Sequence, residues 1–310
     1  MTVGVVIPCY NAAVYVRRAV QSVLENGSIV EKIICVDNNS TDGTLEELMK
    51  LKSDYGEIID VISEDRKGAN WARNKGLESI DSTWVQFLDA DDVISSNKLD
   101  LQAQCGERLG GDVIYSPYFT SDSSGNIEAR PDVENEPILA LVTGLLGITS
   151  SNLFRTQTVK KVGGWNPDWS SSQEYELMFR LLKRGAVFIP LQERLMTYSK
   201  DVPNQISSGP KKNRRENSLR LRAQMIDEFL NREEANSQQL LNGYFNHVRW
   251  VYPYNRELAL REWRHLKDLN YHPTPSLFLP LTYCLLLRVI GFELAEKTRI
   301  TISKYIRHAN

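Results

Sequence analysis

The chain has 310 residues, of which 42% are hydrophobic and 25% are charged, so it can bury the core of one large or two smaller soluble domains. Its net charge of −2 at pH 7 argues against a general nucleic-acid-binding protein. The charge is uneven, because residues 205–310 hold 17 Lys and Arg against 10 Asp and Glu (net +7), whereas residues 1–204 hold 20 against 29 (net −9). This asymmetry predicts an acidic main part and a separate basic C-terminal part.

The cysteines and histidines are scattered and form neither a CxxC pair nor a metal-ligand spacing. The four cysteines are Cys9, Cys35, Cys105 and Cys284. This distribution favours a reduced, cytoplasmic protein and argues against a zinc site. The N-terminus runs directly into an apolar segment, so we expect no signal peptide.

The first ninety residues alternate between apolar runs typical of strands and amphipathic stretches typical of helices. Strands are predicted at 3–8, 32–36, 58–62 and 85–88, and helices at 12–25, 45–52 and 69–79. This alternation, with short polar loops after the strands, predicts an α/β fold with a doubly wound, mostly parallel sheet. No G-x-G-x-x-G segment and no P-loop follows the first strand, which argues against a dinucleotide enzyme and a P-loop enzyme.

The fourth predicted strand ends in an acidic cluster, within the segment W-V-Q-F-L-D-A-D-D at 84–92. Asp89, Asp91 and Asp92 place three carboxylates at one edge of the sheet, where they repel each other unless a cation lies there. Carboxylate oxygens suit Mg²⁺ or Mn²⁺, and open α/β sheets bind ligands at the carboxyl ends of their strands. The sequence therefore predicts a metal–diphosphate site, with a solvated acidic turn as the alternative.

The middle of the chain continues the alternation. Strands are predicted at 112–118, 187–191 and 195–198, and the polar stretch 120–136 contains a hairpin-type loop at 121–126. Helices are predicted at 137–146 and within 170–185, where Ser171 and Ser172 precede the helix. Farther on, helices are predicted at 219–230, 235–252 and 256–269.

Four strand-end segments carry a resemblance to a known family. They are V-V-I-P-C-Y-N, V-D-N-N-S-T-D-G-T, K-G-A-N-W-A-R-N-K-G and F-L-D-A-D-D. In this order and spacing they closely resemble the family 2 glycosyltransferases, which have the Rossmann-like GT-A fold. The resemblance covers about the first two-thirds of the chain. It implies a catalytic domain at 1–205, with a nucleotide-sugar half at about 1–110 and an acceptor half at about 111–205, followed by a mainly helical C-terminal region at 206–310.

The resemblance also implies residues that bind the nucleotide. Pro8, Tyr10 and Asn11 match the loop that borders the base. Asp37 matches the aspartate that accepts a base N–H, which favours a uridine donor because a charge-assisted hydrogen bond discriminates well. The alternative is that Asp37 is an ordinary residue of the turn before a helix.

The diphosphate and the metal are assigned in the same way. Arg73 matches an arginine near the diphosphate, with a solvated helix charge as the alternative. Asp89, Ala90 and Asp91 match the D-x-D segment that binds the nucleotide-sugar and a Mn²⁺ or Mg²⁺ cofactor, with Asp91 favoured as the direct metal ligand. Asp92 is assigned a supporting position behind the metal ligands.

The acceptor half contains V-G-G-W-N at 162–166, which resembles the family's G-G-F turn beneath the acceptor, although a plain tight turn is the alternative. In the family an E-D pair follows at the start of a helix, and its aspartate is the general base. This chain has Gln173-Glu174 instead, so Glu174 is predicted to be the base. Glu176, two residues on and on another helix face, is the competing candidate.

The implied reaction is inverting transfer of a sugar from a nucleotide-sugar, with a UDP-sugar favoured, to a hydroxyl of a saccharide or a lipid-linked acceptor. Such a reaction belongs to the synthesis of polysaccharide, lipopolysaccharide or another glycoconjugate. One alternative is a sugar nucleotidyltransferase, although the glycine-rich basic loop of those enzymes is absent after the first strand. The other is a non-catalytic GT-A scaffold, against which the complete acidic set argues.

Two segments of the tail leave alternatives open. Residues 200–217 are polar and basic, and form either a loop that closes over the donor diphosphate, as in related enzymes, or a plain linker. The apolar segment 276–292 contains Pro280 and Arg288 and is a poor transmembrane span. It is either a helix packed on the catalytic domain or on a second subunit of a homo-oligomer, or a peripheral contact with the inner face of the membrane. Its basic flank would support that contact, through Lys297, Arg299, Lys304 and Arg307.

Overall fold

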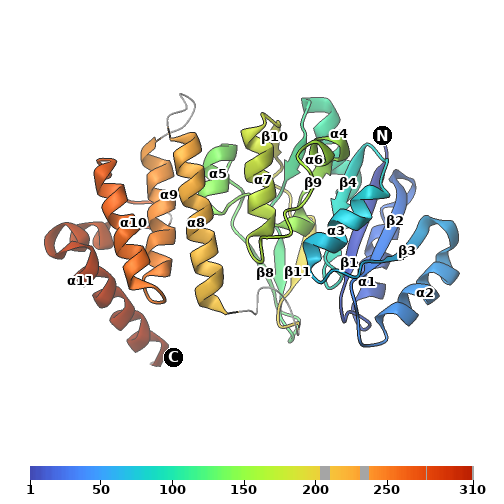
Figure 1. Cartoon of the computed structure of the whole chain (residues 1–310), viewed down its shortest axis with the longest axis horizontal. Helices are drawn as coiled ribbons and strands as arrows, with labels where there is room; N and C mark the ends of the chain where they lie inside the picture. The colour runs from blue at the N-terminus through green and yellow to red at the C-terminus, as the bar shows by residue number, and fades with distance from the viewer. Residues whose placement is uncertain (203–209, 231–236, 277, 309–310) are drawn as a thin grey trace. The chain divides into compact units, whose positions relative to one another are not determined.

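The computed structural model describes residues 1–202, 210–230, 237–276 and 278–308 of the chain, which is shown in Figure 1. The chain divides into two compact units, Met1–Gln205 and Ile206–Asn310. We call them the N-terminal unit and the C-terminal unit.

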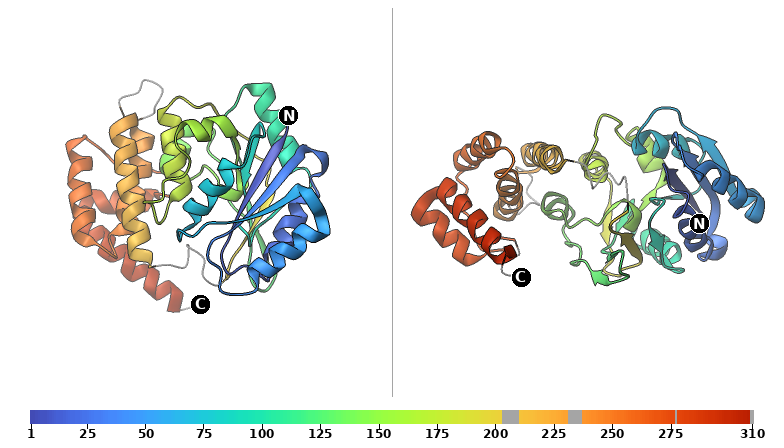
Figure 2. Two further views of the ribbon diagram at one scale, coloured as in Figure 1. Left: turned by 45° about the vertical axis from the view of Figure 1, so that its right-hand side comes forward. Right: turned by 90° about the horizontal axis from the view of Figure 1, so that it is seen from below.

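A seven-stranded sheet forms the centre of the N-terminal unit. Its strands are β1 (Val3–Cys9), β2 (Val30–Asp37), β3 (Ile59–Ser63), β4 (Trp84–Phe87), β6 (Val113–Tyr115), β9 (Leu153–Arg155) and β10 (Phe188–Pro190). Their order is β10-β6-β9-β4-β1-β2-β3, and β1, β2 and β3 lie side by side in shades of blue in Figure 2. All strand pairs are parallel except those of β9 with β4 and β6. The predicted mostly parallel sheet is therefore confirmed.

The register of the strands brings the predicted site loops to one edge. Cys9 lies opposite Asp37, and Asp37 lies opposite Ser63. β4 is parallel to β1, with Phe87 opposite Val6, so the acidic segment leaves the sheet at the same edge. Carboxyl ends of parallel strands are where open α/β sheets bind ligands.

Helices lie against both faces of the sheet. They are α1 (Val16–Leu24), α2 (Thr44–Tyr55), α3 (Ala69–Glu78), α4 (Lys98–Leu109), α5 (Pro137–Thr143), α6 (Thr156–Lys161) and α7 (Gln173–Lys183). Val5 and Ile7 of β1 belong to the core that α1, α2 and α4 cover. Val6 points to the other face and meets α3, where a Cβ on Gly76 would lie 2.3 Å from Val6 Cγ1. Strand residues alternate between the two faces, so this arrangement is the doubly wound fold that the sequence predicts.

A second sheet covers the site edge of the N-terminal unit. Its strands are β5 (Val93–Ile94), β11 (Met196–Ser199), β7 (Phe119–Ser121) and β8 (Ile127–Ala129), in the order β5-β11-β7-β8. β7 and β8 are the antiparallel pair expected of the hairpin-type loop. β5 follows Asp92 directly and pairs with β11, which brings Ser199 to the acidic segment.

The structure differs from the sequence prediction in two connecting segments. The sequence predicts no helix where α4 lies. The polar segment predicted as a loop or linker to residue 217 is instead helical from Lys211, because α8 spans Lys211–Phe229. Lys and Arg are good helix formers, so a basic composition does not exclude a helix. Residues 203–209 of that prediction lie outside the described residues.

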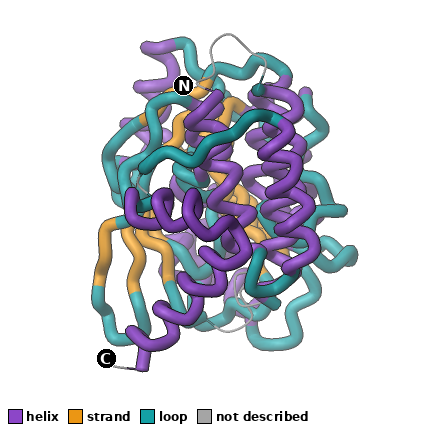
Figure 3. The backbone as a smooth tube through the Cα atoms, turned by 90° about the vertical axis from the view of Figure 1, so that its left-hand side faces the viewer, coloured by secondary structure: helices purple, strands orange, loops and turns teal. Residues whose placement is uncertain are grey.

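The C-terminal unit is a bundle of helices; Figure 3 draws all helices of the chain in purple. Its helices are α8, α9 (Ser237–Val251), α10 (Arg256–Asp268) and α11 (Leu281–His308), which confirms the three helices predicted before residue 270. Phe245 forms its aromatic centre, with ring centroids at 5.1 Å from Trp263, 5.4 Å from Tyr271 and 5.7 Å from Phe292.

Residues 281–292 of the predicted apolar segment form the first half of α11, which is broken at Gly291 (φ 76°, ψ 170°), whereas its first residues precede the helix and residue 277 lies outside the described residues. One face packs inside the C-terminal unit through Tyr283, Cys284 and Leu287. The opposite face exposes Leu281, Leu285 and Val289. Among the residues that the structure describes, no helix combines the length and the apolar character needed to cross a bilayer.

Candidate active site

Asp37 closes β2 and is only 8% exposed. Its Oδ1 is buried and has no hydrogen-bond partner in the described part of the chain. The surrounding loop is fixed by Asn38, whose Nδ2 donates to the carbonyl oxygens of Glu64 and Arg66 and whose Oδ1 accepts from the Gly68 N–H, each at 2.8 Å. A buried acceptor without a partner is costly, so this carboxylate is suited to an N–H donor from a ligand.

The loop after β1 is joined to the turn after Asp37. Asn11 has φ 49°, a conformation that asparagine tolerates better than most residues. Its backbone N–H donates to Ser40 Oγ at 3.1 Å, and its Oδ1 accepts from the Thr41 N–H at 2.8 Å. Pro8 is half-buried and Tyr10 is 47% exposed. The structure therefore brings Pro8, Tyr10 and Asn11 to the strand edge that carries Asp37.

The acidic segment after β4 is held from below by a buried carboxylate. Asp92 is fully buried; its Oδ2 accepts from Ser150 Oγ at 2.7 Å and its Oδ1 from the Ser199 N–H at 3.1 Å. Burial, and then the negative charges of Asp91 and Asp89, raise the pKa of Asp92 well above its usual range. Asp92 thus anchors the turn from inside, while Asp89 and Asp91 are only half-buried.

The backbone of this turn has two further supports. The Asp91 carbonyl oxygen accepts from Ser199 Oγ at 2.6 Å and from Arg18 Nη2 at 3.0 Å. Ser150 Oγ also accepts from the Asp89 N–H at 3.1 Å. Sequence reasoning missed Arg18, Ser150 and Ser199. The only signal was a run of four polar residues before β9, T-S-S-N at 149–152, which is buried.

Arg73 lies on α3 and is 3% exposed. Its Nη2 donates to Asp89 Oδ1 at 2.7 Å, and its Nη1 donates to Gln173 Oε1 at 2.9 Å. Its guanidinium stacks 4.5 Å above the ring of Trp165. Arg73 is therefore not a solvated helix charge but part of the packed interior beside Asp89.

The two candidate bases at the start of α7 have different surroundings. Glu176 is 6% exposed and accepts from Arg180 Nε and Nη2 at 2.7 and 2.8 Å. Arg180 also donates to the carbonyl oxygens of Val162 and Gly164, so this ion pair holds the glycine turn. Glu174 is half-buried, one residue after the start of α7.

Glu174 shares its environment with the acidic segment. The pKa of Tyr118 is raised mainly by burial, and the carboxylates of Glu174 and Asp92 act in the same direction. The three groups therefore lie within electrostatic reach of one another, whereas Arg130 beside Tyr118 opposes them.

Residues 4–164 match the family described as Glycosyl transferase family 2. The chain belongs to this family. A relative in Bacillus subtilis (strain 168), "Putative teichuronic acid biosynthesis glycosyltransferase TuaG", is 30% identical over 211 residues, which cover 66% of this chain and 81% of the relative.

Two solved structures share the fold of this glycosyltransferase. S. aureus TarS 1–349 in complex with UDP-GlcNAc has a TM-score of 0.64 at 16% identity and covers 87% of this chain and 78% of TarS. The mannosyltransferase PcManGT of Pyrobaculum calidifontis, in complex with GDP-Man and Mn²⁺, has a TM-score of 0.58 at 14% identity and covers 86% and 79%. These similarities confirm the GT-A fold that the sequence predicts.

The acidic segment of this glycosyltransferase fits a metal that arrives with its substrate. The described residues contain no group of three or more His, Cys, Asp or Glu side chains that could hold a metal by themselves. Mg²⁺ and Mn²⁺ typically need only one or two carboxylates when substrate phosphates complete the shell. Asp91 and Asp89 are the candidate residues for this role, and Asp89 Oδ1 also accepts from Arg73 Nη2 at 2.7 Å.

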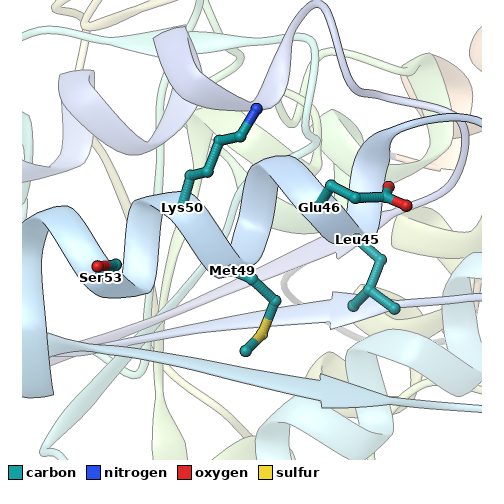
Figure 4. A pocket seen from close by; sticks show the side chains of 5 residues that line it. All are labelled: Leu45, Glu46, Met49, Lys50 and Ser53. Carbon is teal, nitrogen blue, oxygen red and sulfur yellow. The ribbon is translucent and has the colours of Figure 1, made fainter.

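A hollow on the surface of the glycosyltransferase lies elsewhere (Figure 4). Its lining residues, Leu45, Glu46, Met49, Lys50 and Ser53, all come from α2. None of them is a predicted site residue or lies at a strand end, so this hollow is not part of the candidate active site.

Proposed function

We propose that this family 2 glycosyltransferase transfers a sugar, with inversion, from a UDP-sugar to a hydroxyl of a saccharide or lipid-linked acceptor. The observation that carries the proposal is that one sheet edge presents both Asp37, whose buried Oδ1 has no partner among the described residues, and the segment with Asp89 and Asp91 at the end of β4. Asp37 would then bind the nucleobase, and Asp89 and Asp91 would lie at the diphosphate. The UDP-GlcNAc bound to TarS supports a uridine donor, and the name of TuaG supports a place in polysaccharide synthesis.

The reaction needs a general base for the acceptor hydroxyl and a positive charge beside the leaving diphosphate. Asp91 and Asp89 would hold Mg²⁺ or Mn²⁺, which when bound supplies positive charge to the departing diphosphate. Glu174 accepts the proton of the acceptor hydroxyl, and the N-terminus of the eleven-residue helix α7 favours its ionised form. The hydroxyl oxygen forms a bond to the anomeric carbon opposite the leaving group, and the bond to the diphosphate breaks with its electron pair. Attack from that side inverts the configuration.

Thermal unfolding tests the donor class directly. With Mn²⁺ present, UDP at about 100 times its dissociation constant should add about 2.7 kcal/mol to the free energy of unfolding, and GDP, CDP and dTDP at equal concentration should add less. Asp37→Ala should weaken UDP binding by about 10- to 100-fold, because a hydrogen bond to a charged group is lost. Asp81→Ala is the matched control, since that side chain is 99% exposed. Equal stabilisation by UDP, CDP and GDP would exclude the assigned role of Asp37, and no stabilisation by any of the four nucleotides would favour a non-catalytic scaffold.

The exposed face of α11 supports a contact with an anionic membrane surface, where a lipid-linked acceptor would lie. Leu281, Leu285 and Val289 are 58%, 50% and 82% exposed and recur every fourth residue, beside the exposed Arg288. The sequence 281–308 holds five Lys and Arg against two Asp and Glu. An apolar helix face with adjacent cations is typical of interfacial helices.

Sedimentation with lipid vesicles tests this contact. The chain should sediment with vesicles that contain phosphatidylglycerol and remain in solution with neutral ones. Val289→Asp should reduce the bound fraction about tenfold, because a charge replaces apolar area at the interface. Leu45→Asp is the control, since Leu45 is an exposed apolar residue on α2. No vesicle binding, together with a dimer in sedimentation equilibrium that Val289→Asp dissociates, would assign the face to a second copy of the chain instead.

A further inference from the structure

Three polar side chains of α3 point to the acceptor half of the N-terminal unit. Asn70 Nδ2 donates to the Asn166 carbonyl oxygen at 2.7 Å. Asn74 Nδ2 donates to the Trp165 carbonyl oxygen, and Asn74 Oδ1 accepts from the Trp165 N–H, both at 2.8 Å. Arg73 lies between these two asparagines. The helix that follows the third strand of the nucleotide-binding half therefore holds the turn that leads into α7.

Arg73 also connects Asp89, at the proposed diphosphate end of the site, to the start of α7, which carries the proposed general base. Its guanidinium joins Asp89, which follows β4, to Gln173, the first residue of α7 and the neighbour of Glu174. Gln173 is itself fixed, because its Nε2 donates to the Trp169 carbonyl oxygen at 3.1 Å. Arg73 and Gln173 are 3% and 9% exposed, so the hydrogen bond between them is shielded from water. A shielded hydrogen bond from a charged donor holds its acceptor more firmly than one at the surface.

The charges at this bridge explain why a glutamine suits position 173. The buried Arg73 contributes one positive charge, and its carboxylate partner in the described residues is Asp89. Gln173 offers a neutral oxygen, so it binds Arg73 without competing as an anion for the charge that Asp89 needs. It also keeps a second carboxylate away from Glu174.

We propose that Gln173 is a positioning residue for Glu174 and that it acts through Arg73. Arg73 links Asp89, a carboxylate at the site of the nucleotide-sugar donor, to the start of α7, where the proposed general base Glu174 lies. The proposal rests on the proposed sugar transfer. Misplacing a reacting group by about 1 Å can lower a rate about 100-fold, so a fixed link between donor site and base has a kinetic consequence.

A double-mutant cycle with Gln173→Leu and Arg73→Lys tests this bridge of hydrogen bonds from Asp89 through Arg73 to Gln173. Leucine has no oxygen acceptor, and lysine keeps the charge but lacks the fork that reaches two acceptors. The assay measures kcat for sugar transfer or donor hydrolysis, and the dissociation constant of UDP with Mn²⁺ by calorimetry. Gln173→Leu should lower kcat about tenfold or more while the UDP dissociation constant changes less than about twofold. In the Arg73→Lys background the same change should lower kcat less than about twofold, because the partner is already lost.

Two further variants separate positioning from folding. Gln173→Glu keeps an oxygen acceptor for Arg73 but adds a carboxylate that competes with Asp89 and lies next to Glu174, so its kcat should lie between those of wild type and Gln173→Leu. Gln157→Leu on α6 is the matched control, because that glutamine is exposed. Wild-type kcat in Gln173→Leu, or an equal loss in both backgrounds, would overturn the bridge while leaving the proposed transfer intact. A wild-type chain that neither transfers nor hydrolyses any donor would overturn the proposed function and the bridge with it.

Discussion

Glu174→Gln should lower kcat for sugar transfer by about 10²- to 10⁴-fold, the range that general base catalysis contributes. Glutamine keeps the size of the side chain, but an amide NH2 replaces one carboxylate oxygen, and the neutral amide cannot accept the proton of the acceptor hydroxyl. The dissociation constant of UDP should stay near the wild-type value, because Glu174 lies at the start of α7 and not at the strand edge that carries Asp37. Steady-state kinetics with calorimetry of UDP binding checks both expectations.

Glu176→Gln is the control for that result. Glu176 pairs with Arg180, which donates to the carbonyl oxygens of the glycine turn. Its replacement should lower the free energy of unfolding by about 1–3 kcal/mol, the usual value of hydrogen bonds to charged groups, and change kcat much less than Glu174→Gln. The reverse outcome, with Glu176→Gln inactive and Glu174→Gln active, would assign the base to Glu176.

The strand ends and their acidic residues are predictable from local sequence, whereas the contacts that hold them are not. Asp37 and Asp89 each follow an apolar run that fits a buried strand, so their position at the sheet edge follows from chain order alone. The partners of the acidic segment come from far along the chain. Ser199 approaches Asp92 because β11 pairs with β5, and no local pattern records that pairing.

The helix α4, which the sequence does not predict, shows a second reason why sequence-based prediction fails. Its buried face includes Lys98 and Gln102, both fully buried, where an apolar residue would be expected. Lys98 Nζ donates to Gln86 Oε1 of β4 and to Gln102 Oε1, and burial lowers the pKa of Lys98 well below its usual range. A polar network on the inner face removes the apolar periodicity by which a helix is recognised.

Gln173 illustrates the same limit at the site. The sequence shows only that the expected E-D pair reads Gln173-Glu174, which suggests a simple shift in the chemistry of the base. The structure shows that Gln173 binds a buried arginine one hundred positions earlier. Arg73, assigned from the sequence to the diphosphate, is in direct contact with Asp89, the carboxylate proposed to bind the metal. Whether it also contacts the diphosphate stays a prediction.

Asp91→Asn should abolish the metal-dependent part of both binding and transfer. Asparagine keeps the shape of the side chain but lacks the charge that retains Mg²⁺ or Mn²⁺ beside a diphosphate. The loss of the metal's charge at the leaving group should lower kcat by about 10²- to 10³-fold, by analogy with the loss of other preorganised charge-stabilising groups. Mn²⁺ should then add no stability beyond that given by UDP alone in thermal unfolding.

The backbone of Asp91 keeps this test separate from folding. Its carbonyl oxygen accepts hydrogen bonds from Arg18 and Ser199, and Asp91→Asn leaves these two backbone supports in place. Asp92→Asn is the contrasting variant, because that side chain is fully buried and accepts from Ser150 and Ser199. Asp92→Asn should lower the melting temperature in the absence of any ligand more than Asp91→Asn does, because Asp92 is fully buried and Asp91 is only half-buried. Two results together would contradict the metal site: transfer by the wild type that EDTA does not change, and wild-type activity in Asp91→Asn. In that case protein cations neutralise the donor diphosphate, and Asp89 and Asp91 have another role.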